Sequence, residues 1–318
     1  MNPRVLALSG GVGGAKLVLG LDRIHAAGEL SVIVNTADDF THLGLRICPD
    51  LDTTFYTLSG DANPEVGWGR RDESWAFMLA LEQLGGETWF RLGDRDLALH
   101  AYRTSRLAQG ERLTTIMIDV AARRGLATMP LPMTDDPVRT AVITASGPLA
   151  FQHYFVREQC QPAVVSLRYD GAAAARVSPE VAAAFASPRL EAIVICPSNP
   201  YLSIDPLLAV PDLRSLLAKA TVPVIAVTPL VGGRAIKGPT TKIMTELGIP
   251  CSARAIAAHY GELIDGFVLD REDEGLAPSL GMPSCVTNTV MRTLEDRIGL
   301  ARAVVEFAGR LRGSGQRP

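Results

Sequence analysis

The sequence predicts an α/β fold with a doubly wound, mostly parallel, Rossmann-like sheet and helix-rich insertions. Short apolar segments rich in β-branched residues alternate with helical patterns, first over residues 1–60 and again after residue 190. A glycine-rich turn also joins the first strand to the first helix. Strands that alternate with helices in this way are typical of a parallel sheet covered by helices on both faces.

The first part of this pattern begins close to the N-terminus. Strands are predicted over residues 5–8 and 30–35, and the helix between them has apolar positions at Ala15, Leu17, Val18, Leu21 and Ile24. A polar loop is expected from 41 to 50, followed by a helix from 52 to 58. Because ligands bind beyond the carboxyl ends of parallel strands, the residues after these two strands are expected to form the site.

Residues 68–133 are predicted to form a helix-rich insertion. Helices are expected over 75–81, capped by Ser74 and ended by two glycines, and over 97–108 and 113–123. A strand is predicted over 139–144, and residues from about 151 to 188 are expected to form a small lobe.

The alternating pattern returns near residue 190 and completes the core. Strands are predicted over 192–195, 222–227 and 266–269, and helices over 241–247, 252–260 and 293–312. We therefore expect one elaborated α/β domain over residues 1–318, with its core in 1–67 and 134–318.

The turn after the first strand carries the strongest functional signal. Gly10, Gly11, Gly13, Gly14 and Lys16 stand at a strand-to-helix junction, where backbone N–H groups converge and the helix dipole favours an anion. A P-loop would need Gly-Lys-Ser/Thr, but alanine precedes this lysine and leucine follows it. A dinucleotide fingerprint would need a glycine in place of the lysine. The turn predicts phosphate or nucleotide binding, and the alternative is a tight turn that only lets helix and strand pack.

Four aspartates form an acidic cluster near the same edge of the predicted sheet: Asp38, Asp39, Asp50 and Asp52. Carboxylates on loops beside a phosphate site suit Mg²⁺, which is commonly held by one or two carboxylates and by substrate phosphate oxygens. We therefore expect Asp38 or Asp50 to bind a metal ion. Two alternatives stay open, since Asp52 could cap the next helix and Asp38 could bind a ribose hydroxyl.

Two further turns are candidates for substrate contacts. Residues 91–96 are densely charged, and arginine can hold a phosphate bidentately, although a self-paired surface loop explains the segment equally well. Residues 197–200 end a buried strand, where Asn199 offers a donor and an acceptor, and the alternative is a proline-braced turn. Ser198 is not expected to be a nucleophile because the GxSxG elbow is absent. Among the histidines, only His42 lies near the candidate site.

Composition excludes several classes of protein. The net charge of −3 does not indicate a basic nucleic-acid-binding surface. The sequence contains no apolar run of the roughly 18 residues needed to cross a bilayer, and the first strand begins too early to leave room for a signal peptide. Five scattered cysteines, an odd number without a CxxC pair, are expected to be reduced thiols. We expect a cytoplasmic protein.

Taken together, these segments resemble the 2-phospho-L-lactate transferase family of coenzyme F420 biosynthesis. The joint occurrence of the signatures makes the match specific, whereas each short motif alone would be weak. In chain order, the matching segments are 9–16, 35–39, 46–53, 67–69, 92–97, 151–152 with 155–157, and 197–200.

The resemblance implies a Mg²⁺-dependent transferase. It would move a phospholactyl, phosphoenolpyruvyl or phosphoglyceryl group from a guanosine diphosphate-linked donor to the terminal hydroxyl of the deazaflavin Fo and release GMP. Asp38 and Asp50 would bind the metal and act in catalysis, and Asp50, Arg91 and Asp94 would contact Fo. The residues implied at the guanosine diphosphate are Gly10, Gly11, Gly13, Gly14, Lys16, Ser198 and Asn199. The resemblance also implies a homodimer, and it assigns no general base, for which His42 is a weak candidate.

Two other functions remain as alternatives. A non-enzymatic nucleotide-sugar-binding regulator of related fold would bind ligand without turnover. An NAD(P)-dependent oxidoreductase would transfer hydride, and the lysine at position 16 argues against it.

Overall fold

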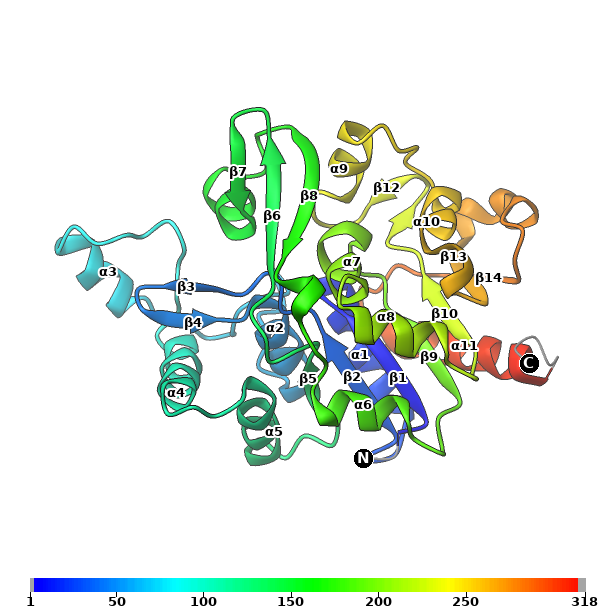
Figure 1. Ribbon diagram of the computed structural model, residues 1–318, viewed down its shortest axis with the longest axis horizontal. Helices are drawn as coiled ribbons and strands as arrows, with labels where there is room; N and C mark the ends of the chain where they lie inside the picture. Colours follow the sequence, from blue (N-terminus) through cyan, green and yellow to red (C-terminus); the bar gives the residue numbers. More distant parts are fainter. Residues whose placement is uncertain (1–2, 314–318) are drawn as a thin grey trace.

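Seven parallel strands form the central sheet of the computed structural model, which describes residues 3–313 (Figure 1). Their hydrogen-bonded order is β5–β2–β1–β9–β10–β13–β14. The chain therefore builds the sheet outward from β1 in one direction, and then returns to the other side of β1 with β9. This order confirms the predicted doubly wound, Rossmann-like fold. The strands are β1 (Val5–Ser9), β2 (Leu30–Val34), β5 (Pro130–Pro132), β9 (Ala192–Ile195), β10 (Val224–Val227), β13 (Gly266–Asp270) and β14 (Ser284–Thr287).

Helices cover both faces of the sheet, and each face has its own core. Alternate residues of β1 point to opposite faces, so that Leu6 and Leu8 join one hydrophobic cluster and Val5 and Ala7 join the other. The cluster around Leu6 includes α6 (Pro179–Phe185), α7 (Asp205–Leu208), α8 (Pro211–Ala218), α9 (Thr240–Glu246) and α10 (Ala253–Tyr260). The cluster around Val5 includes α1 (Gly11–Ile24), α2 (Pro49–Ser59), α5 (Leu113–Arg123) and α11 (Leu294–Gly313).

The segment between α2 and β5 contains the three expected helices, α3 (Ala76–Gln83), α4 (Asp96–Ala108) and α5. The predicted capping of the first of them by Ser74 is wrong. The cap is Asp94, whose carboxylate accepts hydrogen bonds from the backbone N–H of Ala76 at 2.9 Å and of Phe77 at 3.0 Å. The hydroxyl of Ser74 donates to the same carboxylate at 2.6 Å, so the serine supports the cap without making it.

The prediction of a polar loop over residues 41–50 is also wrong. Two short strands, β3 (Phe40–His42) and β4 (Leu45–Ile47), pair there as an antiparallel hairpin. Leu43 (φ 51°) and Gly44 (φ 75°) form its two-residue turn, and two consecutive positive φ angles are what a tight hairpin requires. The helix α2 then begins at Pro49, so Asp50 and Asp52 lie in its first turn.

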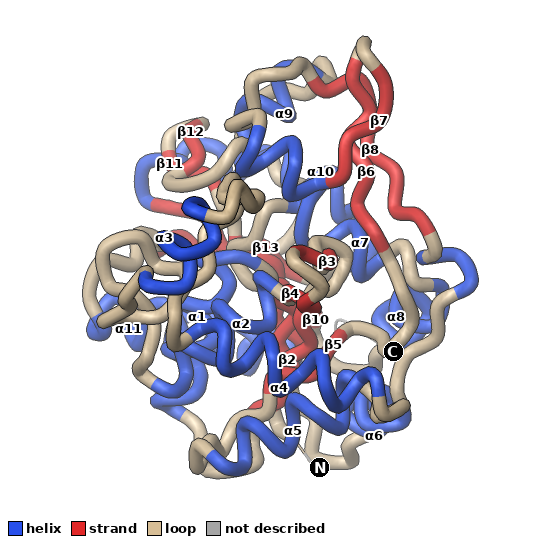
Figure 2. Tube along the Cα trace, turned by 90° about the vertical axis from the view of Figure 1, so that its left-hand side faces the viewer, coloured by secondary structure: helices blue, strands red, loops and turns tan. Residues whose placement is uncertain are grey.

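A second, antiparallel sheet lies outside the central one. It has the order β7–β6–β8, and it contains the strand predicted at 139–144. Its strands are β6 (Arg139–Thr144), β7 (Gly147–Ala150) and β8 (Val164–Asp170). Figures 1 and 2 both show this sheet projecting from the molecule at the end away from the N-terminus.

Two expectations from composition are compatible with the structure. Among residues 3–313, none of the helices combines the length and the hydropathy needed to span a membrane. The five cysteines form no disulfide within this part of the chain.

Candidate active site

One cavity of about 680 Å³ opens at the carboxyl edge of the central sheet. It lies where the strand order reverses, between the ends of β1 and β9, which is the position where doubly wound sheets bind their ligands. Segments from both halves of the chain line it, including the glycine turn, the start of α2 and the loops after β9, β10 and β14.

The glycine turn fits its surroundings only because side chains are absent. A Cβ atom on Gly10 would lie 2.6 Å from the Oδ2 atom of Asp50 and 2.6 Å from the Cβ atom of Ser203. A Cβ atom on Gly13 would overlap the carbonyl oxygen of Pro197. The turn therefore brings the start of α1 into direct contact with the acidic cluster and with the turn at 197–200. Gly11, with φ 64°, adopts the left-handed conformation that favours glycine.

The turn after β9 closes the cradle from the other side. The hydroxyl of Ser198 accepts a hydrogen bond from the backbone N–H of Gly10 at 3.1 Å. The Oδ1 atom of Asn199 accepts from the backbone N–H groups of Tyr201 and Leu202 and so caps the next turn. Its Nδ2 atom is buried without a hydrogen-bond partner among the described residues, so it can donate to a ligand. Both Ser198 and Asn199 line the cavity.

Most residues predicted at the nucleotide come together in this structure. Gly10, Gly11, Gly13, Lys16, Ser198 and Asn199 all line the cavity. Gly14 does not, because it packs beneath the turn, where a Cβ atom would overlap the hydroxyls of Ser9 and Ser198. A glycine is needed at position 14 because the turn packs closely against these hydroxyls.

Asp38 and Asp50 both face the cavity and are both buried, with 6% and 7% of their surface exposed. Burial raises the pKa of Asp38 well above its usual range, and the charge of Asp50 raises it further. Burial also raises the pKa of Asp50 to about 6, against the opposing effect of a hydrogen bond from Asn35. The Nδ2 atom of Asn35 donates to Asp50 Oδ2 at 3.0 Å and so fixes its orientation.

This pair of carboxylates fits a hard divalent cation. Two buried acidic groups that repel each other need a positive charge, and the Oδ1 atom of Asp38 is buried with no hydrogen-bond partner within residues 3–313. Carboxylate oxygens are also the ligands that Mg²⁺ prefers. Asp38 and Asp50 are therefore the residues that would hold the ion.

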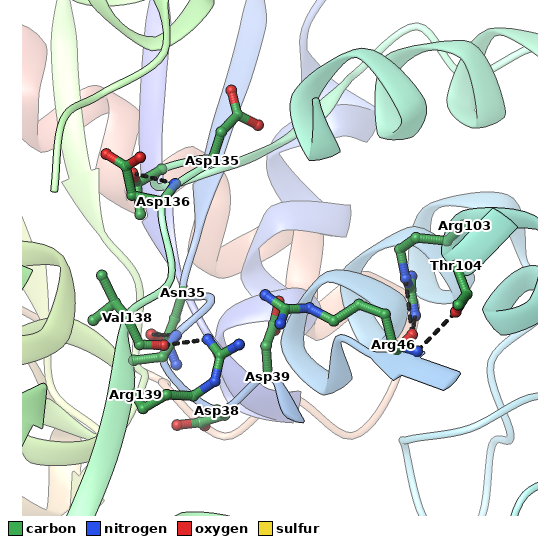
Figure 3. Close-up of polar contacts among 12 residues, drawn as sticks. Asn35, Asp38, Asp39, Arg46, Arg103, Thr104, Asp135, Asp136, Val138 and Arg139 are labelled. Carbon is green, nitrogen blue, oxygen red and sulfur yellow. Dashed lines mark hydrogen bonds and ion pairs between the residues drawn. The ribbon is translucent and has the colours of Figure 1, made fainter. Parts of the chain in front are cut away.

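The neighbouring Asp39 points away from the cavity. Its Oδ2 atom lies 3.4 Å from a guanidinium nitrogen of Arg46. Figure 3 shows Arg46 extending toward Asp39 from β4, while Arg139 approaches the same region from β6. Burial raises the pKa of Asp39 to about 6 although the arginines oppose that shift. Asp39 thus links the hairpin to the sheet, and of these two neighbours only Asp38 lines the cavity.

A buried charged network that the sequence did not reveal supports the first turn of α2. Arg103, which is fully buried, donates to both carboxylate oxygens of Asp52, at 2.6 and 2.9 Å, and to the carbonyl oxygen of Arg46. His100 lies between Asp52 and Asp96, and the hydroxyl of Tyr56 donates to Asp96. Asp52 is therefore paired with an arginine, and it does not cap the helix as the alternative had supposed. The available signal for this network in the sequence was Arg103, a basic residue within the helical pattern of α4.

The two residues predicted to contact Fo from the charged turn have different positions. Arg91 lines the cavity, and its guanidinium lies 4.1 Å from the ring centre of Trp75. Asp94 does not line the cavity, since its carboxylate is used to cap α3. The structure thus gives Asp94 a structural role in place of the implied contact.

His42 also lies away from the cavity. It is 3% exposed and packs among the rings of Phe40, Trp89 and Phe90. Burial lowers the pKa of His42, so a neutral imidazole is favoured at neutral pH. Because it does not reach the lining, His42 is not a candidate for the general base.

The Gly13→Ala variant is expected to lose nucleotide binding and to be less stable by about 1–3 kcal/mol. The added methyl group overlaps the carbonyl oxygen of Pro197, and backbone has to move at the contact between α1 and the turn after β9. Chemical unfolding and calorimetric titration with GDP measure the two effects.

Gly299→Ala is the matched control for this substitution. Gly299 lies in α11, and a Cβ atom there would meet nothing within 4 Å. This variant should gain up to about 1 kcal/mol from helix propensity and keep its nucleotide affinity. Unchanged GDP affinity in Gly13→Ala would contradict the role assigned to the turn.

The chain is similar to known proteins in both sequence and fold. The model of the family described as 2-phospho-L-lactate transferase CofD matches residues 5–279. A phosphoenolpyruvate transferase of Streptomyces griseus is 37% identical, covering 97% of this chain and 99% of the relative. A 2-phospho-L-lactate transferase of Methanosarcina mazei is 36% identical, covering 95% and 99%. A solved structure of a UPF0052 family member from Bacillus halodurans has a TM-score of 0.63 at 15% identity, with 96% and 99% of the two chains covered. That likeness concerns the fold.

Proposed function

The chain belongs to the 2-phospho-L-lactate transferase CofD family of coenzyme F420 biosynthesis, and from this we propose its donor and acceptor. The transferred group is a phospho-three-carbon acid. We propose that it comes from a guanosine diphosphate-linked donor, that the terminal hydroxyl of Fo accepts it, and that GMP is released. The relatives carry both phosphoenolpyruvate and 2-phospho-L-lactate names at similar identity, so the identity of the acid is left to experiment.

The observation that carries the proposal is the contact between the glycine turn and the two buried carboxylates. Asp50 approaches Gly10 so closely that a Cβ atom would not fit between them. A diphosphate held by the backbone N–H groups of the turn would therefore lie beside the oxygens of Asp38 and Asp50. We propose that these two residues bind Mg²⁺, which would neutralise charge on the diphosphate.

The acceptor is supported by the apolar part of the lining. Phe90, Phe151, Phe155 and Val156 line the cavity, and the rings of Phe151 and Phe155 are stacked with their centres 5.4 Å apart. Flat aromatic ligands bind to surfaces of this kind, and Arg91 at the same lining offers a cation for polar ring substituents. The chain can thus hold a deazaflavin ring and leave its hydroxylated chain near Asp50.

The chain's own residues contribute binding and orientation. The glycine turn and Asn199 supply N–H donors for phosphate oxygens, and Asn35 holds Asp50 in place. The cavity buries the reacting groups, which strengthens each of these interactions compared with water. We assign no general base.

Incubation of the protein with Fo, Mg²⁺ and each of the three guanosine diphosphate-linked donors tests the proposal. We expect one donor to give a product with the mass of Fo plus the phospho-three-carbon acid, together with an equal amount of GMP. Binding of the donor without product from any of the three would favour the non-enzymatic regulator instead. Light scattering of the same sample tests the proposed homodimer.

The Arg91→Ala variant is expected to raise the KM for Fo by roughly tenfold and to leave the KM for the donor nearly unchanged. Arg91 lies on the aromatic part of the lining, away from the glycine turn in sequence and held by Trp75. Steady-state kinetics with each substrate varied in turn measures the difference. An equal rise in both KM values would show a general disturbance of the site.

A further inference from the structure

A loop from the start of the helical insertion lies over the glycine turn. We call residues 61–71 the clasp loop. Its base is closed by a bridge between Ala62 and Arg70 and by hydrogen bonds from Arg71 N to Asp61 O at 2.8 Å and from Asn63 N to Gly69 O at 3.0 Å. Asp61 also pairs with Arg124 on the body of the protein. The loop is thus fixed at its base, and only its tip extends over the cavity.

The tip of the clasp loop touches the first turn of α1. A Cβ atom on Gly67 would lie 2.7 Å from a methyl carbon of Val12, so the backbone of Gly67 packs directly against the side chain of Val12. Val66 and Trp68, on either side, both line the cavity although 40% and 57% of their surfaces are exposed. The loop therefore forms part of the cavity wall without being buried in the core.

A single long side chain joins this tip to the opposite half of the protein. The ammonium of Lys237 donates a hydrogen bond to the carbonyl oxygen of Val66 at 2.9 Å. Lys237 follows the small hairpin of β11 (Leu230–Val231) and β12 (Arg234–Ala235), and it lines the cavity itself. Within residues 3–313, no other side chain from the second half of the chain donates a hydrogen bond to the tip residues 65–68.

Lys16 reaches the same end of the cavity from α1. It stands four residues after Val12 and so lies on the same face of the helix, and its ammonium donates to Met291 O at 3.0 Å. Burial lowers the pKa of Lys16, and the charges of Arg297 and Lys237 lower it further. No carboxylate lies within 4 Å of either lysine's ammonium in the part of the chain that the structure describes. The two cations therefore face the cavity without an anion to balance them.

The charges in the cavity are thus separated along the glycine turn. Asp38 and Asp50 lie at the Gly10 side, and Lys16 and Lys237 lie at the side of Val12. Each ammonium has three N–H donors and one hydrogen-bond partner among residues 3–313, a carbonyl oxygen, so two donors of each remain for a ligand. An anion held there would be contacted by both halves of the protein.

We propose that Lys237 and Lys16 together bind the donor phosphate that leaves with GMP, and that Lys237 thereby holds the clasp loop over the bound nucleotide. This assignment rests on the proposed function. The phosphate that is attacked would lie by Asp38 and Asp50, so the second phosphate of the same diphosphate extends along the turn toward the lysines. In this step the hydroxyl oxygen of Fo would bond to the attacked phosphorus and its proton would pass to water, while the bond from that phosphorus to the bridging oxygen breaks and GMP keeps the electron pair. Positive charge at the lysines would stabilise the departing phosphate.

Lys237→Met tests the proposal, with Lys219→Met as a matched control. Lys219 is exposed at the end of α8 and lies outside the cavity. Titration calorimetry with GDP, GMP and phosphoenolpyruvate should show a roughly 10–100-fold weaker affinity of Lys237→Met for both nucleotides, a smaller salt dependence, and no change for phosphoenolpyruvate. Lys219→Met should bind all three as the wild-type protein does, and Lys237→Arg should recover most of the affinity.

Hydrogen exchange separates a clasp from a merely structural lysine. GDP should slow exchange of the amides in residues 61–71 of the wild-type protein and should have little effect on them in Lys237→Met. Nucleotide affinity that is unchanged in Lys237→Met, or a loss confined to phosphoenolpyruvate, would overturn the proposal. If the wild-type protein binds GDP in this Lys237-dependent way but makes no product from Fo, the anion site stands and the proposed transfer fails.

Discussion

The Asp50→Ala variant is expected to release GMP at least about a thousandfold more slowly than the wild-type protein. Asp50 is one of only two carboxylates that we propose as metal ligands, and it lies against Gly10, where the donor diphosphate would bind. Its loss removes a negative charge that Mg²⁺ needs and leaves Asp38 as the single ligand from the protein. Single-turnover measurement of GMP release at saturating Fo and donor gives the effect on the transfer step.

The fold of this variant is expected to stay intact. The charge of Asp50 raises the pKa of Asp38, so removing it relieves a repulsion between buried groups. Without Mg²⁺, the unfolding temperature of Asp50→Ala should therefore be at most about 1–2 °C below that of the wild-type protein. This small decrease corresponds to the loss of the hydrogen bond from Asn35. Mg²⁺ should stabilise only the wild-type protein. Asp212→Ala, on the surface of α8, serves as the control, and near-normal turnover of Asp50→Ala would rule out the proposed metal role.

The parts of the fold that could be predicted from the sequence are those that depend on local patterns. The central strands around Val5, Val194 and Val268 are buried on both faces, so their apolar runs stand out against the helical patterns between them. The hairpin around Leu43 was missed because its strands are only three residues long and contain as many polar as apolar residues. Its only local signal was Gly44, and the pairing itself depends on contacts with the insertion.

The candidate site was predictable where backbone geometry decides it. Glycines at a strand-to-helix junction place N–H groups whatever lies around them, and the structure brings Gly10 and Ser198 together as expected. The sequence prediction chose Asp38 over the adjacent Asp39, and the structure supplies the physical reason, because Arg46 of the unforeseen hairpin pairs with Asp39 while Asp38 lines the cavity. The sequence could not show that Asp94 is occupied by the cap of α3.

Replacing Arg103 by methionine is expected to lower the free energy of unfolding by about 3–5 kcal/mol. Burial lowers the pKa of Arg103, but the charge and hydrogen bonds of Asp52, together with the charges of Cys48 and Asp39, more than offset this. The net pKa is raised, so the guanidinium stays charged. Methionine fills much of the space and removes the charge. Asp52 would then be buried beside Asp96 without its guanidinium partner, and the carbonyl oxygen of Arg46 would lose its donors. Urea unfolding monitored by circular dichroism measures the change.

Two further variants separate the charge from the packing. Arg123→Met removes an arginine whose side chain is 70% exposed and paired with Asp119, and it should change stability by less than about 1 kcal/mol. The double variant Arg103→Met/Asp52→Leu removes both charges of the buried pair and should recover most of the stability lost by Arg103→Met alone. Because Asp52 follows Asp50 by two residues in the first turn of α2, only the single variant should also lose affinity for Mg²⁺. If Arg103→Met/Asp52→Leu is no more stable than Arg103→Met, Arg103 acts through its packing. The charged network of Arg103 and Asp52 would then have no part in holding Asp50.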